Sequence, residues 1–154
     1  MGSWVDEWAD QRVSQQADEH IKAQKFGLAV RAAMMLRLHL VRQLQTDVEE
    51  FSRKFPAHIM GPEEQANQCL RIRTMRLPLE GVDIMFVQNR IEFTRFRVAK
   101  LGDKSMPYDN GVVLVGTDFE GHDWIECDGR KLMNAEEVSR MLLTPVFDHA
   151  VPVG

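Results

Sequence analysis

No proline occurs between Trp4 and Phe55, and Gly27 is the only glycine in that stretch. Proline breaks helices because its ring fixes φ and removes a backbone donor, so nothing local must end a helix before Pro56. A continuous helix over this stretch would be roughly 75 Å long at 1.5 Å per residue, which exceeds a small domain. We therefore expect either one helix that overhangs the domain and demands a partner, or a helical hairpin folded near Gly27.

The middle of this helical segment is apolar on every side. Seven of its apolar residues are Leu28, Val30, Met34, Met35, Leu36, Leu38 and Leu40. A helix that is apolar all round must be covered all round, and a small sheet covers one side. Residues further on form a stripe of period 3.5, with Met34, Val41, Val48 and Phe55 seven apart and Leu44 and Phe51 between them. Such a stripe suits packing on a sheet or a coiled coil, and we expect the sheet.

Before Gly27 the apolar pattern weakens to widely spaced residues among polar ones, namely Trp4, Trp8, Val13, Ala17 and Ile21. This is typical of a half-exposed helix.

From Cys69 onward the pattern changes to short alternating runs bounded by turn residues, which indicates antiparallel strands. A strand over 69–77 is expected at the sheet edge, ended by Pro78. Gln88 and Asn89 occupy a two-residue turn that would pair Ile84 with Phe93 on one buried face. A second hairpin joins 112–117 to 124–127. Residues 56–67 and 101–111 are expected as loops, because they are rich in glycine, proline and polar residues.

The C-terminal region predicts a short helix over 134–143. Asn134 has the position of an N-cap and Glu137 that of the returning acid, while Pro145 should stop the helix. We predict a single α+β domain over residues 1–154: a long N-terminal helix or helical hairpin (1–55), a mainly antiparallel sheet of about five strands (69–127), and this helix. The element order is similar to that of cystatin-like and pocketed cone folds.

Charge is unevenly distributed around a net value of −4. Residues 69–104 contain eight bases and four acids, whereas residues 105–154 contain nine acids and three bases. The basic strand residues Arg71, Arg73, Arg95 and Arg97 are a candidate anion-binding set, although internal pairing with the acidic regions explains them more simply. The acidic total disfavours nucleic acid as the partner.

The motif-like segments of the chain favour structural interpretations. Gly102 to Ser105 lacks the earlier glycine of a phosphate loop, and the acidic run from Asp118 to Asp128 lacks the spacing of a calcium or zinc site. His39 is a catalytic candidate only if a pocket opens beside it. We expect no catalytic residue, no metal and no cofactor.

Cys69 and Cys127 are far apart and outside any CxxC pair, so we expect free thiols. The start of the chain lacks the features of a signal peptide, and the most apolar stretch is interrupted by charges. These features predict a cytoplasmic protein without a membrane span.

The sequence favours a non-enzymatic interaction protein that forms a homodimer or binds another protein through its N-terminal helix. The expected contact residues are Met34, Met35, Leu38 and Val41, because flexible thioethers and aliphatic side chains suit an adaptable surface. The alternative is a small-molecule-binding protein or enzyme with a pocket between helix and curved sheet, next to His39 or Trp124.

Overall fold

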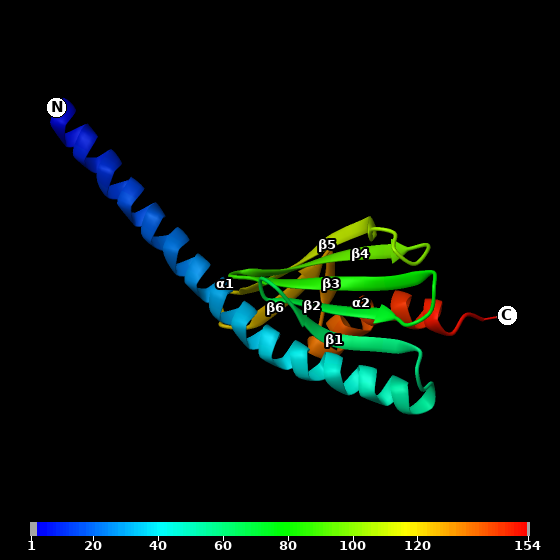
Figure 1. Cartoon of the computed structure of the whole chain (residues 1–154). Coiled ribbons are helices and arrows are strands. Elements are labelled where there is room, and N and C mark those ends of the chain that lie inside the picture. Colours follow the sequence, from blue (N-terminus) through cyan, green and yellow to red (C-terminus); the bar gives the residue numbers. More distant parts are fainter. Residues whose placement is uncertain (1–2, 154) are drawn as a thin grey trace.

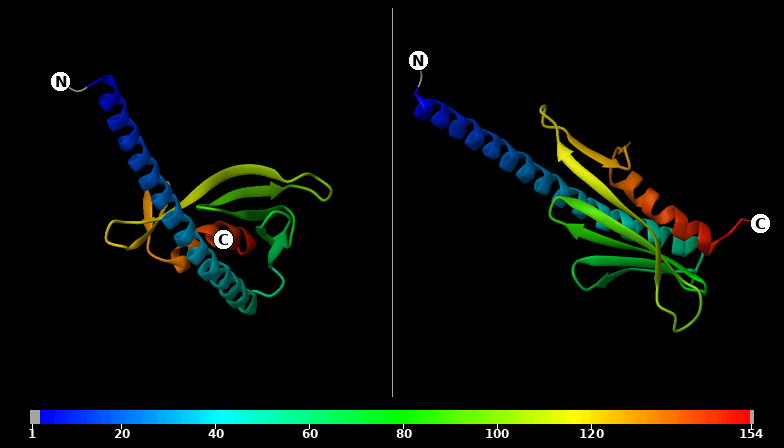
Figure 2. Two further views of the ribbon diagram at one scale, coloured as in Figure 1. Left: turned by 90° about the vertical axis from the view of Figure 1, so that its left-hand side faces the viewer. Right: turned by 90° about the horizontal axis from the view of Figure 1, so that it is seen from above.

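The computed structural model describes residues 3–153, which form two helices and one antiparallel sheet (Figure 1). The elements are α1 (Trp4–Lys54), β1 (Ile59–Gln65), β2 (Cys69–Thr74), β3 (Leu79–Val87), β4 (Arg90–Val98), β5 (Met106–Thr117), β6 (Asp123–Cys127), β7 (Arg130–Leu132) and α2 (Ala135–Ala150). Both helices lie against one face of the sheet, and the first part of α1 projects beyond it (Figure 2). The predicted fold class is confirmed, with seven strands instead of about five.

Helix α1 is continuous through Gly27, so the hairpin alternative is wrong. It contains 51 residues, which corresponds to a length of about 77 Å. Ser3 caps the first turn: its hydroxyl accepts from the Asp6 amide, and the Asp6 carboxylate accepts from the Ser3 amide. The helix ends at Lys54, with Phe55 as the C-cap, immediately before Pro56.

Gly27 gives a test of this continuity. A Cβ at this position would meet no neighbouring group within 4 Å, so Gly27→Ala should stabilise the helix by up to about 1 kcal/mol. The expected result is slower amide hydrogen exchange around residue 27. Gly102→Ala is the matched control, because it also has open space but a φ of +87° that disfavours alanine. A gain in stability for both variants, or for neither, would contradict the assignment.

The core lies between the inner face of the sheet and one stripe of α1. Leu36, Leu40, Leu44 and Val48 are buried at four-residue intervals, and Leu40 and Leu44 are 0% exposed. The expected sheet-packing stripe is therefore confirmed for Leu44 and Val48. It is wrong for Met34 and Phe55, which are exposed, because the buried stripe is centred on Leu40.

The two predicted hairpins are present. In β3–β4, Ile84 pairs with Phe93 and Phe86 with Ile91, and all four side chains are buried. Strands β5 and β6 form the second hairpin, with a polar turn between Thr117 and Asp123.

Several predicted strand assignments are wrong. Residues 59–65 form strand β1 instead of a loop, β2 is therefore an inner strand, and β5 begins at Met106 inside the second expected loop. The sheet thus spans 59–132, beyond the predicted 69–127. Strand β1 was missed because Gly61 and Pro62 are accommodated by a shift in the β1–β2 register, at the sheet edge where proline costs least.

Helix α2 continues to Ala150 despite Pro145, beyond the predicted end at 143. Proline has no N–H, so the carbonyl of Met141 has no helical donor. The buried guanidinium of Arg95, on β4, donates from Nη2 to that carbonyl at 2.9 Å and from Nη1 to the Leu142 carbonyl at 3.0 Å. A side chain from the sheet therefore replaces the donor that the proline lacks.

Neither helix in residues 3–153 combines the length and apolar character that crossing a membrane requires.

Candidate functional site

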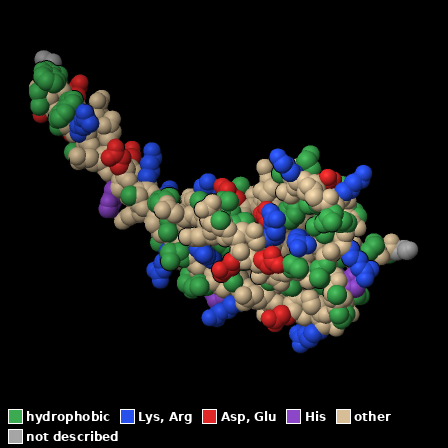
Figure 3. All heavy atoms as spheres, viewed as in Figure 1, with side chains coloured by type: hydrophobic (Ala, Val, Ile, Leu, Met, Phe, Trp, Pro, Cys, Tyr) green, Lys and Arg blue, Asp and Glu red, His purple; other side chains and the backbone are tan. Residues whose placement is uncertain are grey.

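The N-terminal part of α1 is the most exposed element of the structure. Every residue from Ser3 to Leu28 is exposed. This part of α1 is therefore more exposed than the half-exposed helix that the sequence pattern predicted. We call residues 4–20 the arm. Figure 3 shows it as a narrow projection with hydrophobic side chains at its free end. Trp4 is 75% exposed, Trp8 52% and Val13 66%, and the Arg12 guanidinium lies 5.4 Å from the Trp8 ring centroid.

Charge along α1 changes sign where the arm ends. The arm carries five acids and one base. The next acid after Glu19 is Asp47, and the bases between them are Lys22, Lys25, Arg31, Arg37 and Arg42. We call residues 22–42 the basic stretch. One helix thus presents an acidic segment and a basic segment end to end.

The four predicted contact residues lie on the basic stretch, on two different sides of α1. Met34 and Leu38 are 62% and 61% exposed, and Val41 is half-buried. These three border two hollows of about 510 and 460 Å³ between α1 and the β2–β3 side of the sheet. Met35, 47% exposed, faces the other way. The structure therefore brings three of the four together.

On the Met35 side, an open groove runs between α1 and the β5–β6 hairpin. Two hollows of about 710 and 560 Å³ share Val115 and Trp124 and extend along α1 from Ile21 to Thr46. We call this the α1–hairpin groove. Ile21, Leu28 and Met35 line it seven residues apart and are 43–48% exposed.

His39 lies in the α1–hairpin groove near Trp124, where a pocket was expected if the chain binds a small molecule. The lining residues His39, Arg42, Asp123 and Asn134 are all exposed, so the groove is open to solvent. Phe119, at the tip of the hairpin, is 100% exposed, and Lys25 Nζ lies 5.8 Å from its ring centroid.

The candidate anion-binding residues are divided between the two faces of the sheet. Arg71, on the outer face, makes a bidentate ion pair with Asp83 at 2.7 and 2.9 Å and lies 4.5 Å from the Phe96 ring centroid. Arg73, on the same face, donates to the Thr74 carbonyl and contacts the Met60 sulfur. Arg95 and Arg97 point to the inner face, so the structure does not assemble the four into one site.

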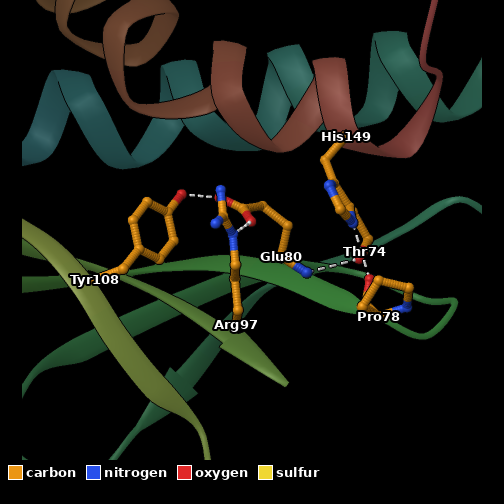
Figure 4. Close-up of polar contacts among 6 residues, drawn as sticks. All are labelled: Thr74, Pro78, Glu80, Arg97, Tyr108 and His149. Carbon is orange, nitrogen blue, oxygen red and sulfur yellow. Dashed lines mark hydrogen bonds and ion pairs between the residues drawn. The ribbon is translucent and has the colours of Figure 1, made fainter. Parts of the chain in front are cut away.

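Arg97 belongs to a polar cluster at one end of the core, shown in Figure 4. Its Nε donates to the buried Glu80 carboxylate at 2.8 Å, and the Tyr108 hydroxyl donates to the other carboxylate oxygen. The Glu80 amide donates to the Thr74 hydroxyl at 3.0 Å. None of the hollows described above borders this cluster, whose contacts satisfy a buried carboxylate.

Both cysteines are buried and free, as the sequence predicted. Burial raises the pKa of the Cys69 and Cys127 thiols, which keeps them protonated and unreactive.

At the β5–β6 turn, Asp118 accepts from the amides of His122 and Glu120 at 2.9 Å, and these bonds lower its pKa. The Asp118 carboxylate of the acidic run thus binds backbone amides of its own turn.

The sequence interpretation missed the arm tryptophans and the charge reversal as site features. Two tryptophans four residues apart, in a segment otherwise dominated by polar residues, could have indicated them.

Comparison of the chain with protein families, curated proteins and solved structures finds no match.

Proposed function

We propose that this chain is a non-enzymatic assembly protein that binds another protein chain through α1. The main support for this proposal is that α1 presents exposed tryptophans on the arm and exposed methionine and leucine side chains on the basic stretch. Of the four predicted contact residues, Met35 lies in the α1–hairpin groove, whereas Met34, Leu38 and Val41 lie on the other side of α1.

Helix energetics support this proposal. Helices shorter than about 15 residues are marginal in water, and most helical stability in proteins comes from packing of an apolar face. The arm is exposed throughout and has no such packing. A partner that covers the arm would supply it.

The side-chain types on α1 support a protein partner. Tryptophan is enriched among the residues that dominate binding energy at protein interfaces, because it buries a large area with few rotatable bonds. Trp4 and Trp8 are adjacent on one side of the arm, while Val13 lies roughly 140° from Trp8 at 100° per residue. The arm thus offers apolar anchors in two directions.

The proposal includes a cytoplasmic location and homodimer formation. Two buried thiols that stay free suit a reducing compartment. A homodimer is favoured because one helix carries two segments of opposite charge.

A small-molecule-binding function is the second candidate. It is favoured by the hollow of about 560 Å³ beside His39 and Trp124, which falls in the size range of ligand sites. Its open lining is less suited to enclosing a ligand than to contacting another chain.

Photo-crosslinking in cells that naturally contain the chain tests the leading proposal. A benzophenone amino acid at Trp8, or at Val13, should give a covalent adduct with another polypeptide chain. The control is the same amino acid at Leu101, which is 90% exposed but lies on the domain. Adducts from both arm positions and none from position 101 are expected; no adduct from either arm position would reject an arm interface.

A further inference from the structure

We infer that the partner is a second copy of this chain, and that the two α1 helices associate antiparallel, with the arm of each copy along the basic stretch of the other. This inference rests on the proposed function and names its partner. The arm would lie along the α1–hairpin groove, the face of α1 that carries Ile21, Leu28 and Met35.

Charge selects the orientation. A parallel pair would place the acidic arms side by side and the two basic stretches side by side, which is repulsive. An antiparallel pair places each acidic arm beside a basic stretch, and charge complementarity of this kind fixes orientation at interfaces. Two-fold symmetry then satisfies both arms at once, because each copy gives and receives the same contact.

The spacing of the charges agrees with this arrangement. Suppose that the two-fold axis passes beside Ile21. A residue of one copy then lies at the same level along the pair as the residue of the other copy whose number brings the sum to 42. Asp10 then lies within one residue of the level of Arg31 in the other copy. Asp18 likewise matches Lys25, and Glu19 matches Lys22. The single base of the arm, Arg12, stacks on Trp8 of its own chain.

The lengths also agree. The arm is about 25 Å long and the basic stretch about 31 Å at 1.5 Å per residue. Along the shared face, Ile21 is 48% exposed, Leu28 43% and Met35 47%. These side chains repeat every seven residues, the period at which two helices keep one seam in contact. The arm continues this repeat with the polar residues Ser14 and Glu7. In the pair, Ile21 would meet Ile21 of the second copy on the axis.

Light scattering on the purified full chain tests the stoichiometry and the charge basis. The wild type is expected to be a dimer. The arm variant D10K/D18K/E19K and the stretch variant K22E/K25E/R31E should each dimerise at least roughly tenfold more weakly, since like charges then lie at the same levels along both contacts. An equimolar mixture of the two variants should restore a dimer. In the mixed dimer the reversed arm meets the reversed stretch, and the other contact joins an unchanged arm to an unchanged stretch. Circular dichroism of each variant checks that the helix persists.

Distances between spin labels test the orientation. Labels at Gln24→Cys should lie within about 20 Å of each other, and labels at Val5→Cys about 48 Å apart. The buried native thiols leave the introduced cysteine as the reactive one. Short distances at both positions would overturn the antiparallel orientation, and variants that dimerise as well as the wild type would overturn its charge basis.

A monomeric wild type would overturn the inference as a whole. Crosslinking separates this failure from failure of the proposed function. If the adducts from positions 8 and 13 contain a different protein, the assembly function stands and self-association is wrong. If neither position gives an adduct, the assembly function fails as well.

Discussion

Replacing Arg95 by methionine is expected to lower the free energy of unfolding by about 3 kcal/mol. The guanidinium donates to the carbonyls of Met141 and Leu142 in α2. Methionine fills much of the same volume but donates nothing, so two acceptors at a buried position lose charge-assisted hydrogen bonds. Urea denaturation followed by circular dichroism measures the loss. A change below about 1 kcal/mol would show that these bonds contribute little.

Pro145→Ala provides the matching background. Alanine restores an N–H that can donate to the Met141 carbonyl within the helix, so this acceptor no longer depends on Arg95. Arg95→Met should therefore cost less in the Pro145→Ala background, by about 1–2 kcal/mol, as expected for residues that share a partner. Equal costs in the two backgrounds would mean that Arg95 and Pro145 act independently.

Leu40→Ala is expected to destabilise the domain by about 3 kcal/mol, because truncating a buried leucine loses apolar burial and leaves a cavity. Leu40 is 0% exposed and lies where α1 crosses the sheet. The measurement is again the free energy of unfolding, at one fixed protein concentration for every variant.

Leu38→Ala is the matched control for Leu40→Ala. Leu38 is two residues away on the same helix but 61% exposed. Its truncation should change the free energy of unfolding of the separate chain by less than about 0.5 kcal/mol. Similar losses for both variants would contradict the assignment of one core-facing and one exposed side to this part of α1.

Features set by neighbouring residues could be predicted from the sequence. The absence of proline before Pro56 predicted the extent of α1, and the turn at Gln88 and Asn89 predicted the pairing of Ile84 with Phe93. The apolar residues all round the middle of α1 also indicated that one chain would leave some exposed. Met34, Met35 and Leu38 are exposed as that argument requires.

Features that depend on distant residues could not be predicted in this way. The continuation of α2 past Pro145 depends on Arg95, about fifty residues earlier in the chain. Strand β1 depends on the pairing partner that β2 provides, which compensates for the glycine and proline within it. The division of Arg71, Arg73, Arg95 and Arg97 between the two faces of the sheet likewise depends on the strand register. The charge of these residues does not determine which face each one occupies.

A sheet whose strands follow one another in sequence order has two terminal strands with unpaired backbone groups, here β1 and β7. Exposed strand edges are templates for aggregation unless the chain blocks them. Pro62 removes a donor from β1, which also has an irregular register, and β7 is only three residues long. The part of β5 that extends beyond β6 contains Pro107 and Asp109. Continuous strand addition is thus hindered at each of these edges, which favours association through side chains.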